Sequence, residues 1–188
     1  MPRSKIAGIG FYVPKNVYTN QDLTKYMDTS DEWIQERTGI KERRYADRLA
    51  ETTTTMGVEA SKIAIERAGI TAQDIDFIIF ATLSPDYYFP GCGVLLQRAM
   101  KMKEIGALDI RNQCSGFVYA LSVADSMIQT GAANRALVIG ADASGAATGR
   151  LGPSRCSCPA LRISTFCVIL GMFWCPGRTR RSRTRQVR

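Results

Sequence analysis

The segment DIRNQCSGFVYALSVADSMIQTG, residues 109–131, decides the fold class of this chain. Residues 115–130 are apolar on almost every side, which predicts a long helix in the centre of a domain, and Gly131 is its expected end. The runs FIIFATL (77–83) and RALVIGADA (135–143) predict strands that are buried on both faces. Strands that alternate with helices in this way predict an α/β fold with a mostly parallel sheet.

Capping and stop signals place the other predicted elements. Asn20 is the expected N-cap of one short helix, and Thr29 with Glu32 three places on is the pattern of a capping box at the start of a second. Gly39 stands where a left-handed helix end is expected. The predicted elements outside the central segment are strands at 5–13, 41–45 and 107–110, short helices at 20–26 and 30–37, and longer helices at 56–68 and 90–100.

Charge is distributed unevenly along the chain. Its 188 residues include 25 Lys and Arg against 17 Asp and Glu, for a net charge of +8. Residues 150–188 contain nine of the arginines and no Lys, Asp or Glu, so residues 1–149 carry 16 basic and 17 acidic groups. A nearly neutral body does not indicate nucleic-acid binding. The chain has no histidine, which excludes catalysis by an imidazole of its own.

The composition of residues 150–188 differs from that of the body, residues 1–149. A segment without carboxylates and rich in Arg, Cys, Pro and Ser is typical of out-of-frame translation, so we expect a non-native or disordered tail. Three alternatives stay open: a genuine but unusual end, a basic arm for nucleic acid at RTRRSRTRQVR (178–188), and a metal site. The metal site would use four cysteines whose spacing matches no tight zinc motif: Cys156, Cys158, Cys167 and Cys175.

Cysteine usage and hydropathy predict a cytoplasmic protein. The body contains only Cys92 and Cys114, which is too few for a disulfide framework. No apolar signal core follows the charged residues at the N-terminus. The longest apolar run, at 166–174, is far shorter than the roughly 20 residues that cross a bilayer. We therefore expect no membrane association.

Cys114 is the strongest candidate for chemistry. Its expected place is the N-terminal end of the long helix, where unpaired N–H groups and the helix dipole favour the thiolate. Ser115 and Gly116 are small enough for a substrate to approach closely. The alternative is a cysteine that serves as a small buried apolar side chain.

Two weaker signals lie nearer the N-terminus. Trp33 and Arg37 are one helical turn apart, so they could sandwich a planar base and meet phosphates, or the indole could simply be packed. Gly8-Ile9-Gly10 resembles the start of a dinucleotide fingerprint, but it lacks the third glycine and Pro14 follows where a helix should begin. A strand that contains glycines is the alternative interpretation there.

Taken together, these stretches resemble beta-ketoacyl-acyl-carrier-protein synthase III, of the thiolase superfamily, over about residues 4–149. The combination of TSDEWI, RTGI and the CSGF cysteine is specific. The matching segments are IAGIGFYVP (6–14), DTSDEWIQERTGIKERR (28–44), TTTTMGVEASKIAIERAGI (52–70), FATLSPDYYFPGCG (80–93), NQCSGFVYALSVADSMI (112–128) and ALVIGADASG (136–145).

The resemblance implies a thiolase-like αβαβα sandwich of two similar halves, of which residues 1–149 match the N-terminal half, with a mostly parallel mixed sheet. It implies that Cys114 accepts an acyl group from coenzyme A as a thioester. Trp33 aligns with the residue that stacks on the adenine, Arg37 with its partner at the nucleotide end, and Thr29 with a neighbour of that pocket. Phe89 aligns with an aromatic that a dimer partner inserts into the acyl pocket.

The family reaction is condensation of an acyl-coenzyme A primer with malonyl-acyl carrier protein. The resemblance also implies a homodimer and no cofactor beyond the coenzyme A thioester. The second half of the family fold supplies a histidine and an asparagine for decarboxylation. Since this chain has no histidine, we expect no condensation by it alone, and at most weak acyl transfer. A related synthase with another starter or acceptor, and a non-catalytic coenzyme A-binding half-domain, are the alternatives.

Overall fold

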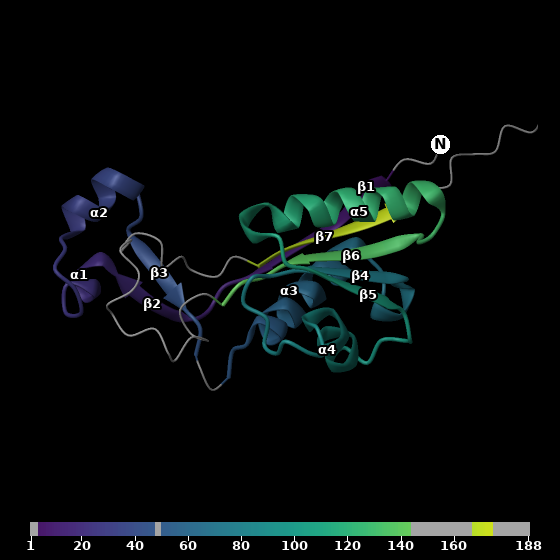
Figure 1. Cartoon of the computed structure of the whole chain (residues 1–188), viewed down its shortest axis with the longest axis horizontal. Helices are drawn as coiled ribbons and strands as arrows, with labels where there is room; N and C mark the ends of the chain where they lie inside the picture. The colour runs from purple at the N-terminus through teal and green to yellow at the C-terminus, as the bar shows by residue number, and fades with distance from the viewer. Residues whose placement is uncertain (1–3, 48–49, 144–166, 175–188) are drawn as a thin grey trace, which may run out of the picture.

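The structure, a computed structural model, describes residues 4–47, 50–143 and 167–174, the last of these as backbone only. Its main body is a five-stranded mixed sheet in the order β1-β7-β6-β4-β5. Helix α5 covers one face, and α3 and α4 cover the other (Figure 1). The elements of this body are β1 (Ser4–Tyr12), α3 (Thr53–Ala68), a 3-10 turn (Ala72–Asp74), β4 (Phe77–Ala81), α4 (Cys92–Ala99), β5 (Gly106–Ile110), a 3-10 turn (Gln113–Ser115), α5 (Gly116–Thr130), β6 (Arg135–Gly140) and β7 (Cys167–Trp174).

Strand β4 forms the centre of the core. It runs parallel to both β5 and β6, and its side chains alternate between the two layers of helices. Ile78 and Phe80 belong to the cluster that includes α3 and α4, whereas Ile79 and Ala81 belong to the cluster under α5. The predicted α/β fold with a mostly parallel sheet is therefore confirmed.

Helix α5 is buried on one side only. Ala120, Ala124 and Ile128 pack on the sheet, while Val118 and Tyr119 are 63% and 53% exposed. The prediction of a helix in the centre of a domain is thus wrong for the described part of the chain, where α5 forms an outer layer. An apolar outer face is what the resemblance implies for a helix layer that meets a second half. Within the described ranges, no helix is both long enough and apolar enough to cross a membrane.

The two glycines of β1 bring that strand close to α3. A Cβ atom at Gly8 would overlap the carbonyl oxygen of Ala64, and one at Gly10 would overlap that of Ala60. No helix follows β1, because the chain continues into strand β2. Gly8-Ile9-Gly10 is therefore a packing motif, and the dinucleotide hypothesis is wrong.

A small lobe stands apart from the sheet at the left of Figure 1. It consists of β2 (Asn16–Thr19), α1 (Asn20–Leu23), α2 (Asp31–Thr38) and β3 (Glu42–Tyr45), with β2 and β3 paired antiparallel. Both helix N-caps in the lobe differ by one residue from the prediction. Thr19 caps α1 in a capping box with Asp22, and the Ser30 hydroxyl caps α2 by accepting from the Trp33 N–H. Neither Asn20 nor Thr29 is therefore the N-cap of its helix.

Several element boundaries also differ from the prediction. α3 begins three residues earlier because Thr52 caps it in a box with Thr55, and α4 begins at Cys92, two residues after Pro90. Strand β2 was not predicted, since all four of its residues are exposed and no apolar alternation marks it. β7 was not predicted either: it pairs antiparallel with both β1 and β6, inside the sheet, and belongs to the segment that we expected to be a tail. The other predictions for residues 144–166 and 175–188 lie outside the described residues.

Candidate active site

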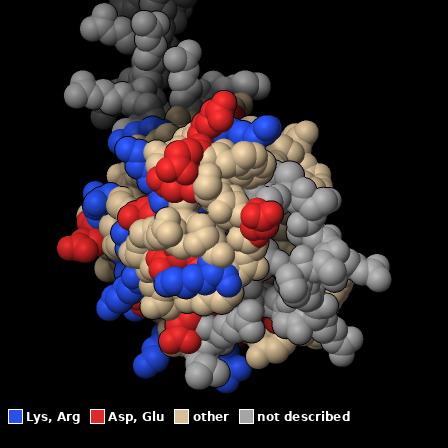
Figure 2. Space-filling model, turned by 90° about the vertical axis from the view of Figure 1, so that its left-hand side faces the viewer, with Lys and Arg blue, Asp and Glu red and all other residues tan. Residues whose placement is uncertain are grey.

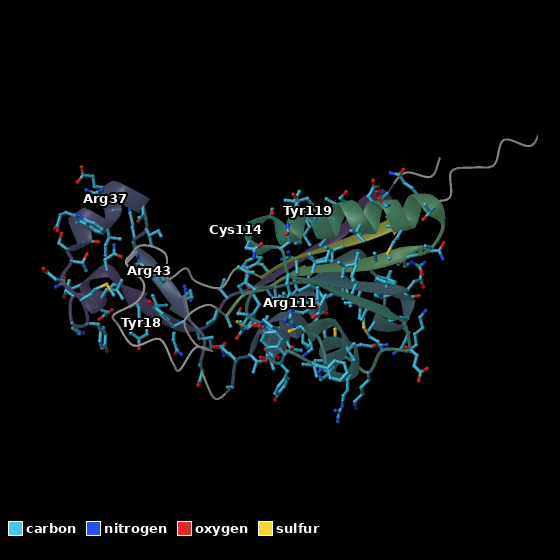
Figure 3. All side chains as sticks on the ribbon, viewed as in Figure 1. Tyr18, Arg37, Arg43, Arg111, Cys114 and Tyr119 are labelled. Carbon is cyan, nitrogen blue, oxygen red and sulfur yellow. The ribbon has the colours of Figure 1, made fainter. Side chains whose placement is uncertain are left out.

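Cys114 lies in the 3-10 turn between β5 and α5, at the end of α5 that is nearer the lobe (Figure 3). Its side chain is exposed. The other described cysteine with a free thiol, Cys92, is fully buried, and burial raises the pKa of that thiol. The hypothesis of a buried apolar cysteine therefore fails for Cys114 and applies to Cys92.

The turn around Cys114 has an unusual backbone. Gln113 has φ of 45°, a left-handed conformation that costs an ordinary side chain about 1–2 kcal/mol. The Ser115 hydroxyl donates to the carbonyl oxygen of Asn112 at 3.2 Å and does not cap α5. The first N–H groups of this 15-residue helix thus have no cap from Ser115, and the positive end of its dipole lies beside Cys114.

A cleft of about 240 Å³ lies next to the Cys114 thiol. It opens at the carboxyl ends of the adjacent parallel strands β4 and β6, which is where ligands commonly bind in sheets of this kind. The residues that line it are Ala81, Thr82, Gln113, Cys114, Phe117, Gly140, Ala141 and Asp142.

Asp142 organises one wall of this cleft. Its Oδ1 atom accepts hydrogen bonds from Leu83 N at 2.7 Å, from Thr82 Oγ1 at 3.1 Å, and from both Ser84 N and Ser84 Oγ at 3.2 Å. Ser84 Oγ in turn accepts from Ala143 N at 2.7 Å. The loop after β4 is thereby fixed to the end of β6. Sequence reasoning missed Asp142, although a carboxylate directly after a buried strand is a signal that could have identified it.

A larger cleft, of about 390 Å³, lies next to the N-terminus of α3 and is lined in part by the same loop. Asp86 closes that helix end by accepting from Thr52 Oγ1 at 2.8 Å and from Thr54 N at 3.2 Å. The residues that line the cleft are Glu51, Thr52, Thr53, Thr54, Thr55, Pro85, Asp86, Tyr87, Leu95 and Ala143.

Phe89 lines neither cleft. It is 91% exposed and its neighbour Tyr88 is 90% exposed, so both rings project from the surface. Arg111 contacts Tyr88 in two ways. Its guanidinium carbon lies 4.9 Å from the ring centre, and its Nη2 atom donates to the Tyr88 carbonyl at 3.2 Å. In this chain the structure therefore does not bring Phe89 to Cys114.

Helix α2 presents Trp33 and Arg37 on one face, as the spacing predicts. The guanidinium carbon of Arg37 lies 4.9 Å from the centre of the Trp33 ring, and the indole is 39% exposed. One face of the indole packs against Arg37, so a packed ring and a ring that stacks on a base remain two interpretations of the same pair. Because the guanidinium lies over the ring, a base can be sandwiched between the two side chains only if Arg37 swings outward. Thr29 is half-buried, and its hydroxyl oxygen has no hydrogen-bond partner.

Trp33 and Arg37 are carried by the lobe, whereas Cys114 is carried by the sheet body (Figure 3). The two groups are separate along the long axis of the molecule, which suits a long ligand with chemically different ends. Within the described ranges, no group of three or more Cys, Asp or Glu residues is placed to hold a metal ion.

Comparisons with known proteins relate this chain to one family. Residues 108–149, which include Cys114 and Asp142, match the family model of 3-Oxoacyl-[acyl-carrier-protein (ACP)] synthase III. Beta-ketoacyl-[acyl-carrier-protein] synthase III of Aquifex aeolicus is 52% identical over 139 residues, 74% of this chain and 44% of that protein. The chain belongs to the 3-oxoacyl-[acyl-carrier-protein] synthase III family. It spans less than half the length of the curated relatives that it matches.

Solved structures extend the match to the fold. The crystal structure of 3-oxoacyl-[acyl-carrier-protein] synthase III from Aquifex aeolicus VF5 aligns with 93% of this chain and 55% of its own, at a TM-score of 0.83 and 44% identity. The priming beta-ketosynthase from the R1128 polyketide biosynthetic pathway aligns with 93% of this chain and 51% of its own, at a TM-score of 0.84 and 28% identity. The predicted thiolase-like fold is thereby confirmed for the N-terminal part of the family architecture.

Proposed function

We propose that this chain carries the acyl-accepting part of a beta-ketoacyl-acyl-carrier-protein synthase III site. In the proposed step, the Cys114 sulfur attacks the carbonyl carbon of an acyl-coenzyme A thioester. A new carbon–sulfur bond forms, the bond to coenzyme A breaks, and the released coenzyme A thiolate takes up the proton that left Cys114. The product is an acyl-enzyme that is ready to prime fatty-acid synthesis.

One observation carries this proposal: an exposed thiol stands at the uncapped N-terminal end of a long helix, next to a cleft at the ends of two parallel strands. That end of the helix carries partial positive charge on its free N–H groups. The same N–H groups are placed to stabilise negative charge that develops on a carbonyl oxygen during attack. Ser115 and Gly116, which are small, leave room for the thioester.

The nucleotide end of coenzyme A is assigned to the lobe. Trp33 offers an exposed aromatic face for the adenine, and Arg37 offers a cation for the phosphates. Thr29 contributes a buried hydroxyl without a hydrogen-bond partner, beside the start of the same helix.

Condensation needs more than these residues supply. Family members use a histidine and an asparagine for decarboxylation of malonyl-acyl carrier protein, and this chain contains no histidine. Any imidazole in the reaction therefore comes from outside these 188 residues. The proposal includes acyl carrier protein as the acceptor and a cytoplasmic location. It also includes a homodimer in which the exposed Phe89 ring closes the acyl pocket of the partner subunit.

Acetyl-coenzyme A and intact-protein mass spectrometry test the central step. We expect a mass increase of one acetyl group, mapped by peptide digestion to Cys114 and abolished by Cys114→Ser. Cys92→Ala is the matched control, because that thiol is buried and should leave labelling unchanged. Acetylation that persists in Cys114→Ser, or no acetylation of the wild-type chain, contradicts the proposal.

The choice of acyl group is a separate question. The likeness to a polyketide priming ketosynthase favours a family relative with another starter as the second candidate. A panel of acyl-coenzyme A thioesters, compared by the rate of Cys114 labelling, distinguishes the two candidates: preference for acetyl supports the first, and preference for a longer or branched acyl group supports the second.

A further inference from the structure

Asn20 occupies a central place in the lobe that its sequence position did not suggest. Its side chain is 1% exposed. The Nδ2 atom donates to Oδ1 of Asp31 and to the carbonyl oxygen of Ile40, both at 2.7 Å. The Oδ1 atom accepts from Nη1 of Arg43 at 2.6 Å. We name these four residues (Asn20, Asp31, Ile40 and Arg43) the Asn20 clasp.

The clasp joins the two ends of α2. Asp31 is the first residue of that helix, and Ile40 follows the left-handed Gly39 that ends it. One carboxamide group therefore bonds to both ends of the helix that carries Trp33 and Arg37. A helix of eight residues is marginal on its own, and Ile34 is the one residue of α2 that is fully buried. Its position therefore depends on these polar contacts.

Charge fixes the orientation of the amide. Its oxygen points to the buried guanidinium of Arg43, and its nitrogen points to the carboxylate of Asp31, so each end faces a charge of opposite sign. Gln35 bonds the second oxygen of Asp31 at 2.7 Å. The donated hydrogen bonds, that of Asn20 first, hold the pKa of the Asp31 carboxyl below its ordinary value.

Arg43 has no carboxylate partner among the described residues. It is 1% exposed, and its Nε and Nη2 atoms make no hydrogen bond. A buried guanidinium with a single neutral acceptor is costly, and removal of that acceptor would leave the charge without compensation. The hydrogen bond from Arg43 thus fixes the position of Asn20, and Asn20 in turn fixes the position of α2.

From this geometry we infer that Asn20 is a positioning residue for the nucleotide end of the coenzyme A site, acting through α2 on Trp33 and Arg37. The inference rests on the proposed function. Among the described residues on the face of the molecule that the lobe forms, Lys and Arg lie interspersed with Asp and Glu (Figure 2). Phosphates on that face are therefore recognised by the placement of particular side chains and not by a general positive field.

Isothermal titration of the full chain with coenzyme A tests the inference. We expect Asn20→Ala to weaken binding at least tenfold, and the exposed Asn16→Ala in β2 to leave it unchanged. If Asn20 acts through these two side chains, then Asn20→Ala should add nothing in a background that carries both Trp33→Ala and Arg37→Ala. A purely structural role would instead give additive losses in the combined variant, and would overturn the inference.

The outcomes separate the inference from the proposed function. If the wild-type chain does not bind coenzyme A, the proposed nucleotide site fails and the inference fails with it. If the wild-type chain binds and Asn20→Ala binds equally well, the inference alone is overturned. If Asn20→Ala does not fold, Asp31→Asn replaces it, because this variant keeps the shape of the side chain and removes the charge that orients Asn20. A loss of coenzyme A affinity of at least threefold then supports the inference, and unchanged affinity overturns it.

Discussion

The backbone N–H of Leu83 donates to Oδ1 of Asp142 at 2.7 Å, and this bond joins the loop after β4 to the end of β6. Since that loop forms part of both clefts, the shape of the candidate site depends on one carboxylate oxygen. The register between β4 and β6 ends at Ala81 and Gly140, and the side chain of Asp142 then connects the two segments beyond the strands.

Replacement of Asp142 should therefore destabilise the chain. We expect Asp142→Ala to lower the free energy of unfolding by about 2–3 kcal/mol, because several donors lose their acceptor. Asp142→Asn retains an oxygen and should cost less. Urea denaturation measures both variants, and Asp28→Ala, which removes an exposed carboxylate, is the control with an expected change within about 0.5 kcal/mol. Equal stability of Asp142→Ala and wild type would contradict the assigned role.

The contact between β1 and α3 should not tolerate a methyl group. We expect Gly10→Ala to cost about 2–3 kcal/mol, because the new Cβ meets the carbonyl oxygen of Ala60 and the backbone of α3 has to move. Gly116→Ala is the matched control: its Cβ would find Ala81 Cβ at 3.6 Å, an ordinary contact, so stability should stay the same or rise slightly. Thermal unfolding followed by circular dichroism compares them, and the two variants should differ clearly in midpoint.

Tyr12 should make the free energy of unfolding depend on pH in the alkaline range. Its phenol donates to Glu51, and this hydrogen bond, with burial as the second cause, raises its pKa from 10.0 to about 12. Because the folded-state pKa lies above the unfolded one, the stabilisation is complete below pH 10 and is lost as the pH rises through 12. The stability difference between wild type and Tyr12→Phe should therefore shrink over that range.

Absorbance titration of the phenols provides the direct measurement for Tyr12. Tyr12→Phe should remove one group that ionises near pH 12. A high-pH phenol that persists in Tyr12→Phe would assign the shift to another tyrosine.

The backbone next to Cys114 makes a further prediction. Gln113 has a left-handed φ, which asparagine tolerates and β-branched residues do not. Gln113→Val should cost about 1–2 kcal/mol and change the rate at which iodoacetamide alkylates Cys114, while Gln113→Asn should be nearly neutral in both measurements. Gln21→Val, at an exposed site in α1, controls for the side-chain change itself. Similar stability of Gln113→Val and Gln113→Asn would show that the turn is not strained.

Patterns with a local physical cause could be predicted from the sequence. Continuous apolar runs indicated β4 and β6, and the glycines at 39, 69 and 131 have positive φ where the helices end. Cys114 could be chosen because a thiol at a strand-to-helix junction is chemically distinctive. That Trp33 and Arg37 share one face of a helix follows from their spacing alone.

Features that depend on distant partners could not be predicted. Asn20 follows Thr19, and either residue could cap a helix; the choice depends on Arg43 and Asp31, which are remote in sequence. Asp142 becomes important only because the loop after β4 folds against it. β7 carries no local signal that tells a sheet strand from any other apolar run, and its place is given by β1 and β6.

The position of β7 joins the two ends of the described chain within one sheet. Among the described strands, β1 is hydrogen-bonded to the sheet through β7 alone, with Ile9 opposite Leu170. Strands β4, β5 and β6 with their helices can assemble from contacts that are closer in sequence, and α3 can receive β1 before the sheet does. The sheet therefore reaches β1 only through the last described strand, and closing so long a loop carries an entropic cost that the contacts among β4, β5 and β6 do not.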